Sequence, residues 1–304
     1  MTAERPAERS PRSAFAINLL IVLALGAALA SLYGPLLLWL GREAMTVKQL
    51  QNGGLIVLFA LVISLRKTIR AQRFQFEANN LGIGLLVVGV ACLYLVRIIP
   101  AYALPVALLS FCLSFAGVAS FLFGAAGVRA LLPAIVGILL LGLLAGLAPS
   151  LDWPLRGLGA RLGHYFLQKL GVDVNVAFQP GEPPALILAI RDRLFVVAAE
   201  CNGFGLLTSS LLLAVIMGFH YRLTGLDKLL LLVTAVPVAI VFNALRIVGI
   251  CVAATRTSLP YDLIHETIGI IFYVVALSLL WWLARRRAEP EEAVSEGGRP
   301  KFEV

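Results

Sequence analysis

Residues 131–148 read LLPAIVGILLLGLLAGLA, a run without a single charged side chain. A helix needs roughly 20 apolar residues to cross a hydrocarbon core of about 30 Å, so this run predicts a transmembrane helix. Comparable runs recur along most of the chain and together predict eight spans. We place these spans at 14–40, 46–65, 81–99, 101–123, 131–148, 204–219, 228–254 and 266–283.

The composition of the whole chain agrees with a membrane protein. Of the 304 residues, 60% are apolar and 14% are charged, whereas soluble domains have about 45–50% apolar and about 25% charged residues. These values exclude a soluble globule, a disordered chain, a collagen-like fibre and a small disulfide-rich module. We assign the net charge of +8 to cytoplasmic loops that hold the topology and contact membrane lipids, and we expect no nucleic-acid partner.

The basic clusters between the apolar runs predict the orientation of the chain. They place both termini in the cytoplasm, because Lys and Arg concentrate in the loops on that side of a membrane. We expect a cytoplasmic segment at 1–13, a single integral-membrane domain at 14–283 and a disordered cytoplasmic tail at 284–304. The segment 149–202 then lies on the extracytoplasmic side.

The extracytoplasmic segment has structure of its own. Apolar residues recur every three or four positions over 155–170, which predicts an amphipathic helix at the membrane interface. Residues 172–178 alternate as a strand does, and 185–190 with 194–199 form a predicted β-hairpin. The predicted fold is therefore an all-α polytopic membrane protein of about eight transmembrane helices, with an amphipathic helix and a small β-hairpin before the sixth span.

Cys201 is the first candidate functional residue, because it lies where the hairpin meets the sixth span. A helix N-terminus stabilises a thiolate through its dipole and its unpaired N–H groups. The backbone N–H groups of Asn202, Gly203 and Phe204 are candidates for binding an oxyanion. The alternative is a half-buried structural thiol beside a turn. The other cysteines lie in apolar runs, and no His or Cys spacing predicts a metal or another cofactor.

Arg246 and His265 are the other two candidates. Arg246 lies inside the seventh predicted span, where a guanidinium costs a few kcal/mol, and Asn243 one turn earlier also favours polar surroundings. The alternative for Arg246 is snorkelling toward headgroups. His265, followed by Glu266, begins the eighth span on the same side as Cys201. The alternative for His265 is an ordinary amphipathic residue at the interface.

The three residues together favour nucleophilic catalysis at an amide or ester. A thiolate would attack, an imidazole would carry protons and a guanidinium would hold the oxyanion. Two alternatives belong to other classes of protein. One is a transporter or channel in which Arg246 binds an anionic substrate, and the other is a non-catalytic scaffold for envelope assembly.

The sequences around these residues resemble the exosortase/archaeosortase family of membrane cysteine transpeptidase-like enzymes. The resembling segments are VAAECNGFGLLTS at 197–209, FNALRIVGI at 242–250 and HETIG at 265–269, within a region of likeness over 194–283. The His in the third segment is similar to the bacterial exosortases, whereas Asn202 departs from the Ser that many of them have.

The resemblance implies a sorting enzyme in the inner membrane. Such enzymes recognise a C-terminal sorting tail on exported proteins, made of a short motif, a transmembrane helix and a basic cluster, and they cleave near the motif. Carried onto this chain, Cys201 would be the nucleophile, Arg246 the oxyanion stabiliser and His265 the proton carrier, with the site outside the cytoplasm. We also expect the hairpin to bind an extended tail by strand addition.

Overall fold

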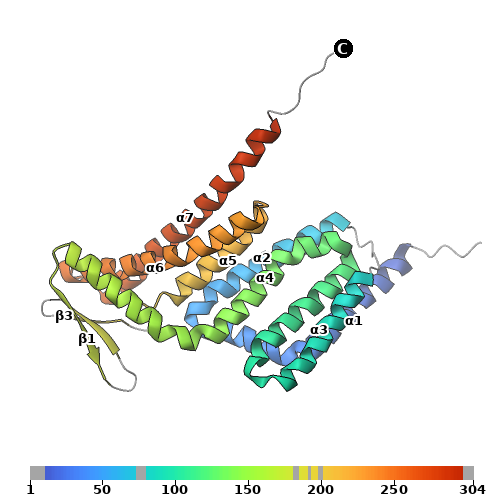
Figure 1. Ribbon diagram of the computed structural model, residues 1–304, viewed down its shortest axis with the longest axis horizontal. Helices are drawn as coiled ribbons and strands as arrows, with labels where there is room; N and C mark the ends of the chain where they lie inside the picture. Colours follow the sequence, from blue (N-terminus) through green and yellow to red (C-terminus); the bar gives the residue numbers. More distant parts are fainter. Residues whose placement is uncertain (1–10, 73–79, 181–184, 191–192, 198–200, 297–304) are drawn as a thin grey trace, which may run out of the picture. The chain divides into compact units, whose positions relative to one another are not determined.

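Helices make up most of the computed structural model, which describes residues 11–72, 80–180, 185–190, 193–197 and 201–296 (Figure 1). A short 3₁₀ helix, Pro100–Tyr102, connects the third and fourth helices. The helices are α1 (Pro11–Thr46), α2 (Lys48–Gln72), α3 (Asn80–Ile98), α4 (Ala103–Lys169), α5 (Phe204–His220), α6 (Gly225–Arg256) and α7 (Tyr261–Glu296).

Six of the described helices are long and apolar enough to cross a membrane, so the chain is a multi-pass membrane protein. The predicted count of eight is not confirmed. Nearly all of the fourth predicted span, the fifth span and the amphipathic helix lie in α4, which consists of two helices joined across a kink at Gly124 (φ 60°, ψ −166°). The sixth predicted span is α5, an apolar helix of 17 residues. The kink lies directly after the fourth predicted span, so the break expected between the fourth and fifth spans is present at Gly124.

A three-stranded antiparallel sheet follows α4. Its strands are β1 (Val174–Gln179), β2 (Ala185–Ile190) and β3 (Arg193–Val196), in the order β1-β2-β3. In the register, Val174 pairs with Ile190 and Leu188 pairs with Phe195. The predicted hairpin therefore forms, with β1 added at one edge. The last two residues of its predicted second strand, 198 and 199, lie outside the described residues.

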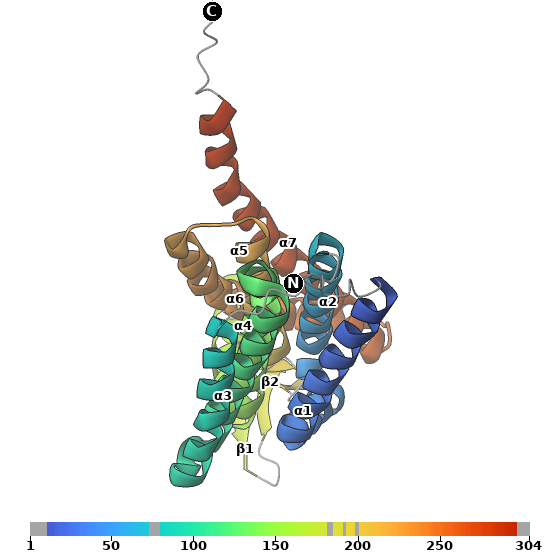
Figure 2. The same cartoon turned by 90° about the vertical axis from the view of Figure 1, so that its right-hand side faces the viewer.

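The described chain groups into two compact units. The first contains residues 1–42 and 58–143, and the second contains 43–57 and 144–304. The single domain expected over 14–283 stays a prediction. Within the first unit, α3 lies along the first part of α4 (Figure 2). A Cβ on Gly82 or Gly117 would approach the facing backbone within 2.5 to 2.6 Å, so small residues permit this close packing.

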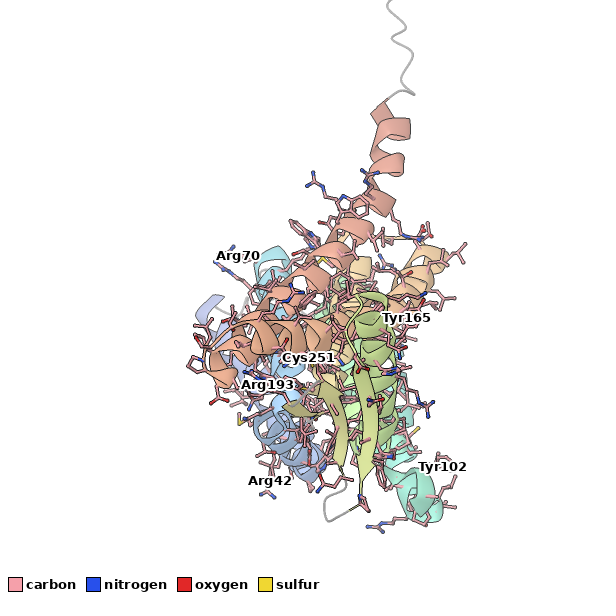
Figure 3. The ribbon with its side chains drawn as sticks, turned by 90° about the vertical axis from the view of Figure 1, so that its left-hand side faces the viewer. Arg42, Arg70, Tyr102, Tyr165, Arg193 and Cys251 are labelled. Carbon is pink, nitrogen blue, oxygen red and sulfur yellow. The ribbon has the colours of Figure 1, made fainter. Side chains whose placement is uncertain are left out.

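In the second unit, α5, α6 and α7 pack against one another. The sheet packs on the last part of α4 and on α6 through buried side chains that include Leu167, Leu188, Phe195 and Ile247. Figure 3 shows Arg193 beside α6, where its guanidinium donates to the carbonyl oxygen of Ala254. This contact satisfies a carbonyl in the last turn of α6.

The two predicted cytoplasmic ends lie partly outside the described residues. Residues 1–10 of the expected segment 1–13 and residues 297–304 of the expected tail fall there. The remainder of the tail region differs from the expected disorder, because α7 continues to Glu296.

Candidate active site

Cys201 lies just before α5, in a short segment that ends at Gly203. Gly203 is the N-cap of α5 and has φ 80° and ψ 2°, a left-handed conformation that favours glycine. Its carbonyl oxygen accepts the first helical hydrogen bond, from Leu207 N–H at 2.9 Å. A Cβ at Gly203 would also lie 2.6 Å from Cγ of Asn243. Both backbone conformation and space therefore require glycine next to Cys201.

The thiol of Cys201 contacts the imidazole of His265. Their Sγ and Nε2 atoms are 3.2 Å apart, although 64 residues separate them in the sequence. Cys201 is 6% exposed, and it borders a small apolar cavity of about 20 Å³. The expected meeting of these two residues on one side of the protein is thus a direct side-chain contact in the structure.

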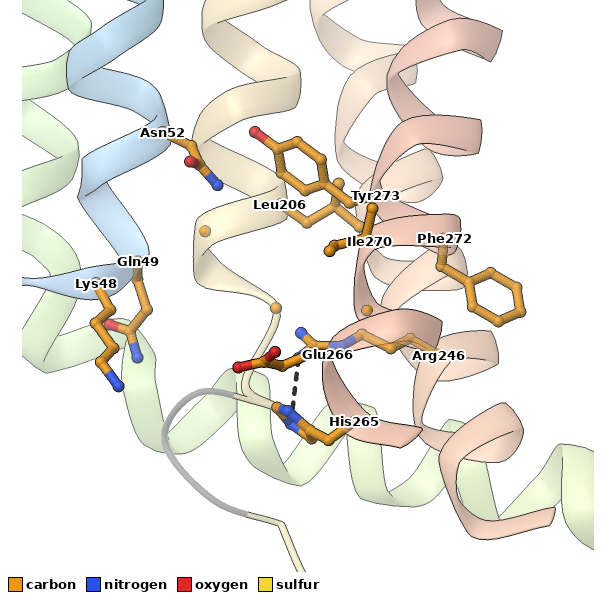
Figure 4. Close-up of a pocket in the computed structure, with 13 residues that line it drawn as sticks. Lys48, Gln49, Asn52, Leu206, Arg246, His265, Glu266, Ile270, Phe272 and Tyr273 are labelled. Atoms are coloured by element: carbon orange, nitrogen blue, oxygen red, sulfur yellow. Dashed lines mark hydrogen bonds between the residues drawn. The ribbon is translucent and has the colours of Figure 1, made fainter. Parts of the chain in front are cut away.

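Arg246 contacts the same imidazole nitrogen. One terminal nitrogen of its guanidinium lies 3.2 Å from His265 Nε2, and the pair is drawn in Figure 4. Arg246 belongs to α6 and His265 to the first turns of α7. Gly269 leaves room for the guanidinium between the two helices, because a Cβ at this position would lie 3.2 Å from Arg246 Nε.

The shared nitrogen defines the proton arrangement of the cluster. A guanidinium only donates hydrogen bonds, so Nε2 supplies its lone pair to Arg246 in this geometry. A neutral His265 then carries its proton on Nδ1, and the Cys201 thiol faces the nitrogen that can accept its proton. The arrangement therefore pairs a nucleophile with a base and sets a cation beside them.

Asn243 and Asn202 hold the backbone around the thiol. Asn243 Nδ2 donates to the Cys201 carbonyl at 3.0 Å, and both asparagines are 3% exposed. Phe204 N–H donates to Asn202 Oδ1 at 2.8 Å. That N–H group therefore already donates a hydrogen bond, whereas the sequence made it a candidate for binding an oxyanion. The N–H groups of Asn202 and Gly203 stay candidates for that role.

Arg246 and His265 line a pocket of about 400 Å³ in the second unit. Glu266, expected as a supporting polar residue, lies on the same wall. The opposite side comes from the first turn of α2 (Figure 4). The remaining lining residues are Lys48, Gln49, Asn52, Gly203, Gly205, Leu206, Gly269, Ile270, Phe272 and Tyr273.

Sequence reasoning missed the contribution of α2 to this pocket. Asn52 hydrogen-bonds with the hydroxyl of Tyr273, which in turn donates to Ser209 Oγ at 2.8 Å. The available signal was the polar start of the second predicted span, where Lys48, Gln49 and Asn52 interrupt an apolar helix. Polar residues in a membrane span are a default functional hypothesis.

The fold and the site define a class of protein: a multi-pass membrane protein that brings together the side chains used in cysteine acyl transfer. Comparison with protein families then gives the particular family. The model of the transmembrane exosortases (Exosortase_EpsH) matches residues 45–282. The chain belongs to this family of membrane sorting enzymes, and the match includes every residue of the pocket. No curated protein and no solved structure matches the chain.

Proposed function

We propose that this protein is a cysteine transpeptidase or peptidase that cleaves the C-terminal sorting tails of exported envelope proteins. One observation carries the proposal: His265 Nε2 lies 3.2 Å from the Cys201 thiol and 3.2 Å from the Arg246 guanidinium. A buried thiol with a base on one side and a cation within reach has the parts that acyl transfer requires. Membership of the exosortase family supports the same activity.

The first chemical step starts when a substrate carbonyl enters beside Arg246. Its oxygen competes for the guanidinium, and Nε2 is released to accept the thiol proton. The sulfur then attacks the carbonyl carbon, a C–S bond forms and the carbonyl electron pair moves onto the oxygen. Arg246, with the N–H groups of Asn202 and Gly203, stabilises the resulting oxyanion.

The second half of the reaction returns the proton and releases the products. The tetrahedral intermediate collapses, the C–N bond breaks and the leaving amine takes the proton from Nε2 of His265. The acyl group stays on Cys201 as a thioester. An acceptor nucleophile or water then attacks the thioester and gives its proton to Nε2 of His265. The C–S bond breaks, and the leaving sulfur takes the proton back from Nε2, which restores the thiol.

Membrane tethering explains why the nucleophile is set in a bundle of helices. A sorting tail carries its own transmembrane helix, so its cleavage motif arrives at a fixed depth. An enzyme whose thiol lies at that depth gains effective concentration and orientation without a large binding surface. We place the site on the extracytoplasmic face of the inner membrane, with both termini in the cytoplasm.

The free edge of β3 is the proposed binding place for the extended tail. Val197 N–H donates to Leu186 O at 2.7 Å, and in an antiparallel ladder such groups alternate in direction. The backbone groups of Leu194 and Val196 therefore point away from β2. Val196 and Val197 border the same small cavity as Cys201, so an added strand would run next to the thiol.

Proline substitution tests strand addition. Leu194→Pro removes an edge-facing N–H group, whereas the matched Leu194→Ala keeps it and removes only the side chain. We expect Leu194→Pro to process the tail more slowly than Leu194→Ala at equal protein level. Equal processing by the two variants would exclude the β3 edge as the binding place.

The enzyme proposal is tested by co-expression with a tail-bearing envelope protein. Substrate mobility is compared for wild type, Cys201→Ala, Cys201→Ser, Arg246→Ala and His265→Ala, with enzyme in the membrane quantified for each. Cys251→Ala is the matched control, because Cys251 is also buried in the same apolar cluster. We expect unprocessed substrate in the Cys201 and Arg246 variants and normal processing by Cys251→Ala. Full processing by Cys201→Ala would exclude the enzyme and favour a transporter or a scaffold.

The orientation has its own test. In a variant that keeps only Cys201 of the four cysteines, a small membrane-impermeant thiol reagent is applied to intact cells from outside. We expect labelling of Cys201 from that side, since the site is proposed to open there. Labelling only after the cells are permeabilised would place the site on the other face.

A further inference from the structure

A hydrogen-bonded chain of side chains connects the segment of Cys201 to the last part of α4. Asn202 Nδ2 donates to Asp152 Oδ1 at 2.6 Å. Arg156, one turn further along α4, donates to both oxygens of the same carboxylate. Its Nε lies 3.1 Å from Oδ1, and its Nη2 lies 2.5 Å from Oδ2. The order of the chain is therefore Arg156, Asp152, Asn202.

Asn202 connects this chain to the start of α5. Its side-chain oxygen accepts from Phe204 N–H at 2.8 Å while its nitrogen donates to Asp152. Both ends of one buried amide are thus used, one on the backbone of the catalytic segment and the other on α4. The amide cannot rotate by 180° without losing both hydrogen bonds, so its orientation is fixed.

A second attachment comes from α6. Asn243 Nδ2 holds the Cys201 carbonyl at 3.0 Å, and Asn243 also fills the space beside Gly203. The segment 201–204 is therefore attached on two sides, by Asp152 from α4 and by Asn243 from α6. Neither attachment involves the thiol, the imidazole or the guanidinium.

We propose that the Arg156–Asp152 ion pair positions the Cys201 nucleophile through Asn202. Asp152 and Arg156 are positioning residues that do not contact the reacting atoms. The bidentate contact with Arg156 fixes the carboxylate plane. The fixed carboxylate then sets the Asn202 amide, the entry of α5 and the direction of the neighbouring thiol. The proposal rests on the proposed acyl-transfer function for its kinetic readout only.

Charge explains why the carboxylate needs Arg156. Asp152 and Arg156 are partly buried, with side chains 30% and 15% exposed. A carboxylate without its cation at this position would draw water or turn toward solvent, and Asn202 would lose a fixed partner. A displacement of about 1 Å at a reacting group can cost on the order of a hundredfold in rate.

A reciprocal exchange of the two side chains tests the proposal. Asn202→Asp sets a carboxylate against Asp152, and Asp152→Asn removes the charge that holds Arg156. The double variant Asp152→Asn with Asn202→Asp restores a donor facing a carboxylate, now in the opposite direction. We expect Asn202→Asp to lower kcat about tenfold to a hundredfold with KM nearly unchanged. We expect the double variant to recover only part of this loss, because residue 202 regains a hydrogen-bond partner while Arg156 has no carboxylate at 152 to bind.

A second readout does not depend on catalysis. The alkylation rate of Cys201 by a small neutral thiol reagent is measured without substrate, in a background lacking the other three cysteines. We expect Asn202→Asp to change this rate and the double variant to restore it only in part. Arg287→Ala is the control, because it removes an ion pair to Asp227 of similar exposure elsewhere in the second unit, and we expect wild-type values for it.

The outcomes separate this proposal from the proposed function. If wild type does not process the substrate, the function fails, and the alkylation rates still test the positioning. Equal alkylation rates for wild type and Asn202→Asp would overturn the positioning role. A raised KM with unchanged kcat would also overturn it, because that pattern indicates a substrate contact. Full recovery by the double variant, at equal protein level, would overturn the role of the ion pair as well, because that variant lacks the carboxylate that Arg156 binds.

Discussion

Two polar clusters in this protein differ in burial and in chemistry. The hydroxyl cluster of the first unit contains Tyr33, Ser110 and Ser114, and the thiol cluster of the second unit contains Cys201, Arg246 and His265. In the hydroxyl cluster, the Tyr33 hydroxyl lies 2.8 Å from Ser110 Oγ and 2.7 Å from Ser114 Oγ. Ser110 Oγ also donates to the Gly89 carbonyl at 2.6 Å.

The comparison contrasts polar groups that hold helices together with polar groups for which we propose a chemical role. Neutral hydroxyls that satisfy one another and a helix carbonyl stabilise helix packing in an apolar bundle. The thiol cluster instead contains a cation, a base and a nucleophile, and it borders a pocket of about 400 Å³. Burial of polar residues alone therefore does not mark a site, whereas a partly buried cation beside an imidazole and a thiol at a pocket is a stronger indication.

The largest effect on substrate processing is expected from Arg246→Lys in the thiol cluster. The ammonium keeps the charge but has neither the length nor the planar donors of the guanidinium. We expect processing to fall by about a hundredfold to a thousandfold, the loss typical for one oxyanion donor. Rates are measured with purified enzyme and a tail peptide in detergent. A rate within tenfold of wild type would contradict the oxyanion role of Arg246.

Gly203→Ala should produce the next largest effect. An alanine at 203 would have to keep the positive φ of Gly203, which costs roughly 1–3 kcal/mol. Its Cβ would also lie 2.6 Å from Asn243 Cγ. We expect a lower melting temperature and slower processing. The matched control is Gly84→Ala in α3, where an added Cβ meets nothing within 4 Å and both quantities should stay unchanged. Equal melting temperatures and equal processing rates in the two variants would contradict the requirement for glycine at the start of α5.

Tyr33→Phe should separate the two clusters most clearly. It removes one hydroxyl from the first unit, and membrane-embedded hydrogen bonds contribute about 1 kcal/mol each. We therefore expect a small loss of stability in thermal unfolding and processing at the wild-type rate per folded molecule. Loss of processing in a fully folded Tyr33→Phe enzyme would mean that the hydroxyl cluster also has a functional role.

The smallest effect is expected from Arg287→Ala. The Arg287–Asp227 pair joins α7 to the start of α6 at 2.8 Å, and solvated ion pairs contribute little to stability. Melting temperature and processing should both stay close to wild type. A marked loss of processing would show that ion pairs remote from the thiol also affect processing. The Arg156–Asp152 pair would then not differ from other ion pairs in this respect.

The sequence could reveal the thiol cluster because each member breaks a local pattern. Arg246 is a charge inside an apolar run, Cys201 lies at a helix start, and His265 lies at the mouth of the last span. Their direct contact through one imidazole nitrogen follows from helix packing that no local pattern encodes. Asp152 and Lys48 were missed for the same reason, since a single carboxylate and a lysine at a helix start look ordinary in a sequence.

The fold was predictable in class and less so in its boundaries. Hydropathy correctly indicated a multi-pass helical protein, and alternation correctly indicated strands over 185–190 and near 174–178. The break after the fourth predicted span is present at Gly124, whereas the continuation of the helix from the fifth span through 149–154 was not predictable, because the polar residues there suggest separate segments. Backbone continuity depends on tertiary packing, which overrides local breaks in an apolar pattern.

The most direct test is to capture the covalent intermediate. Enzyme is mixed with a tail-bearing substrate, quenched in acid and digested, and the peptides that contain the four cysteines are examined by mass spectrometry. We expect a hydroxylamine-sensitive substrate adduct on Cys201 and none on Cys92, Cys112 or Cys251, with the Cys201 adduct lost in Arg246→Ala. Cleavage of the substrate with an adduct on another cysteine would contradict the assignment of Cys201 as the nucleophile.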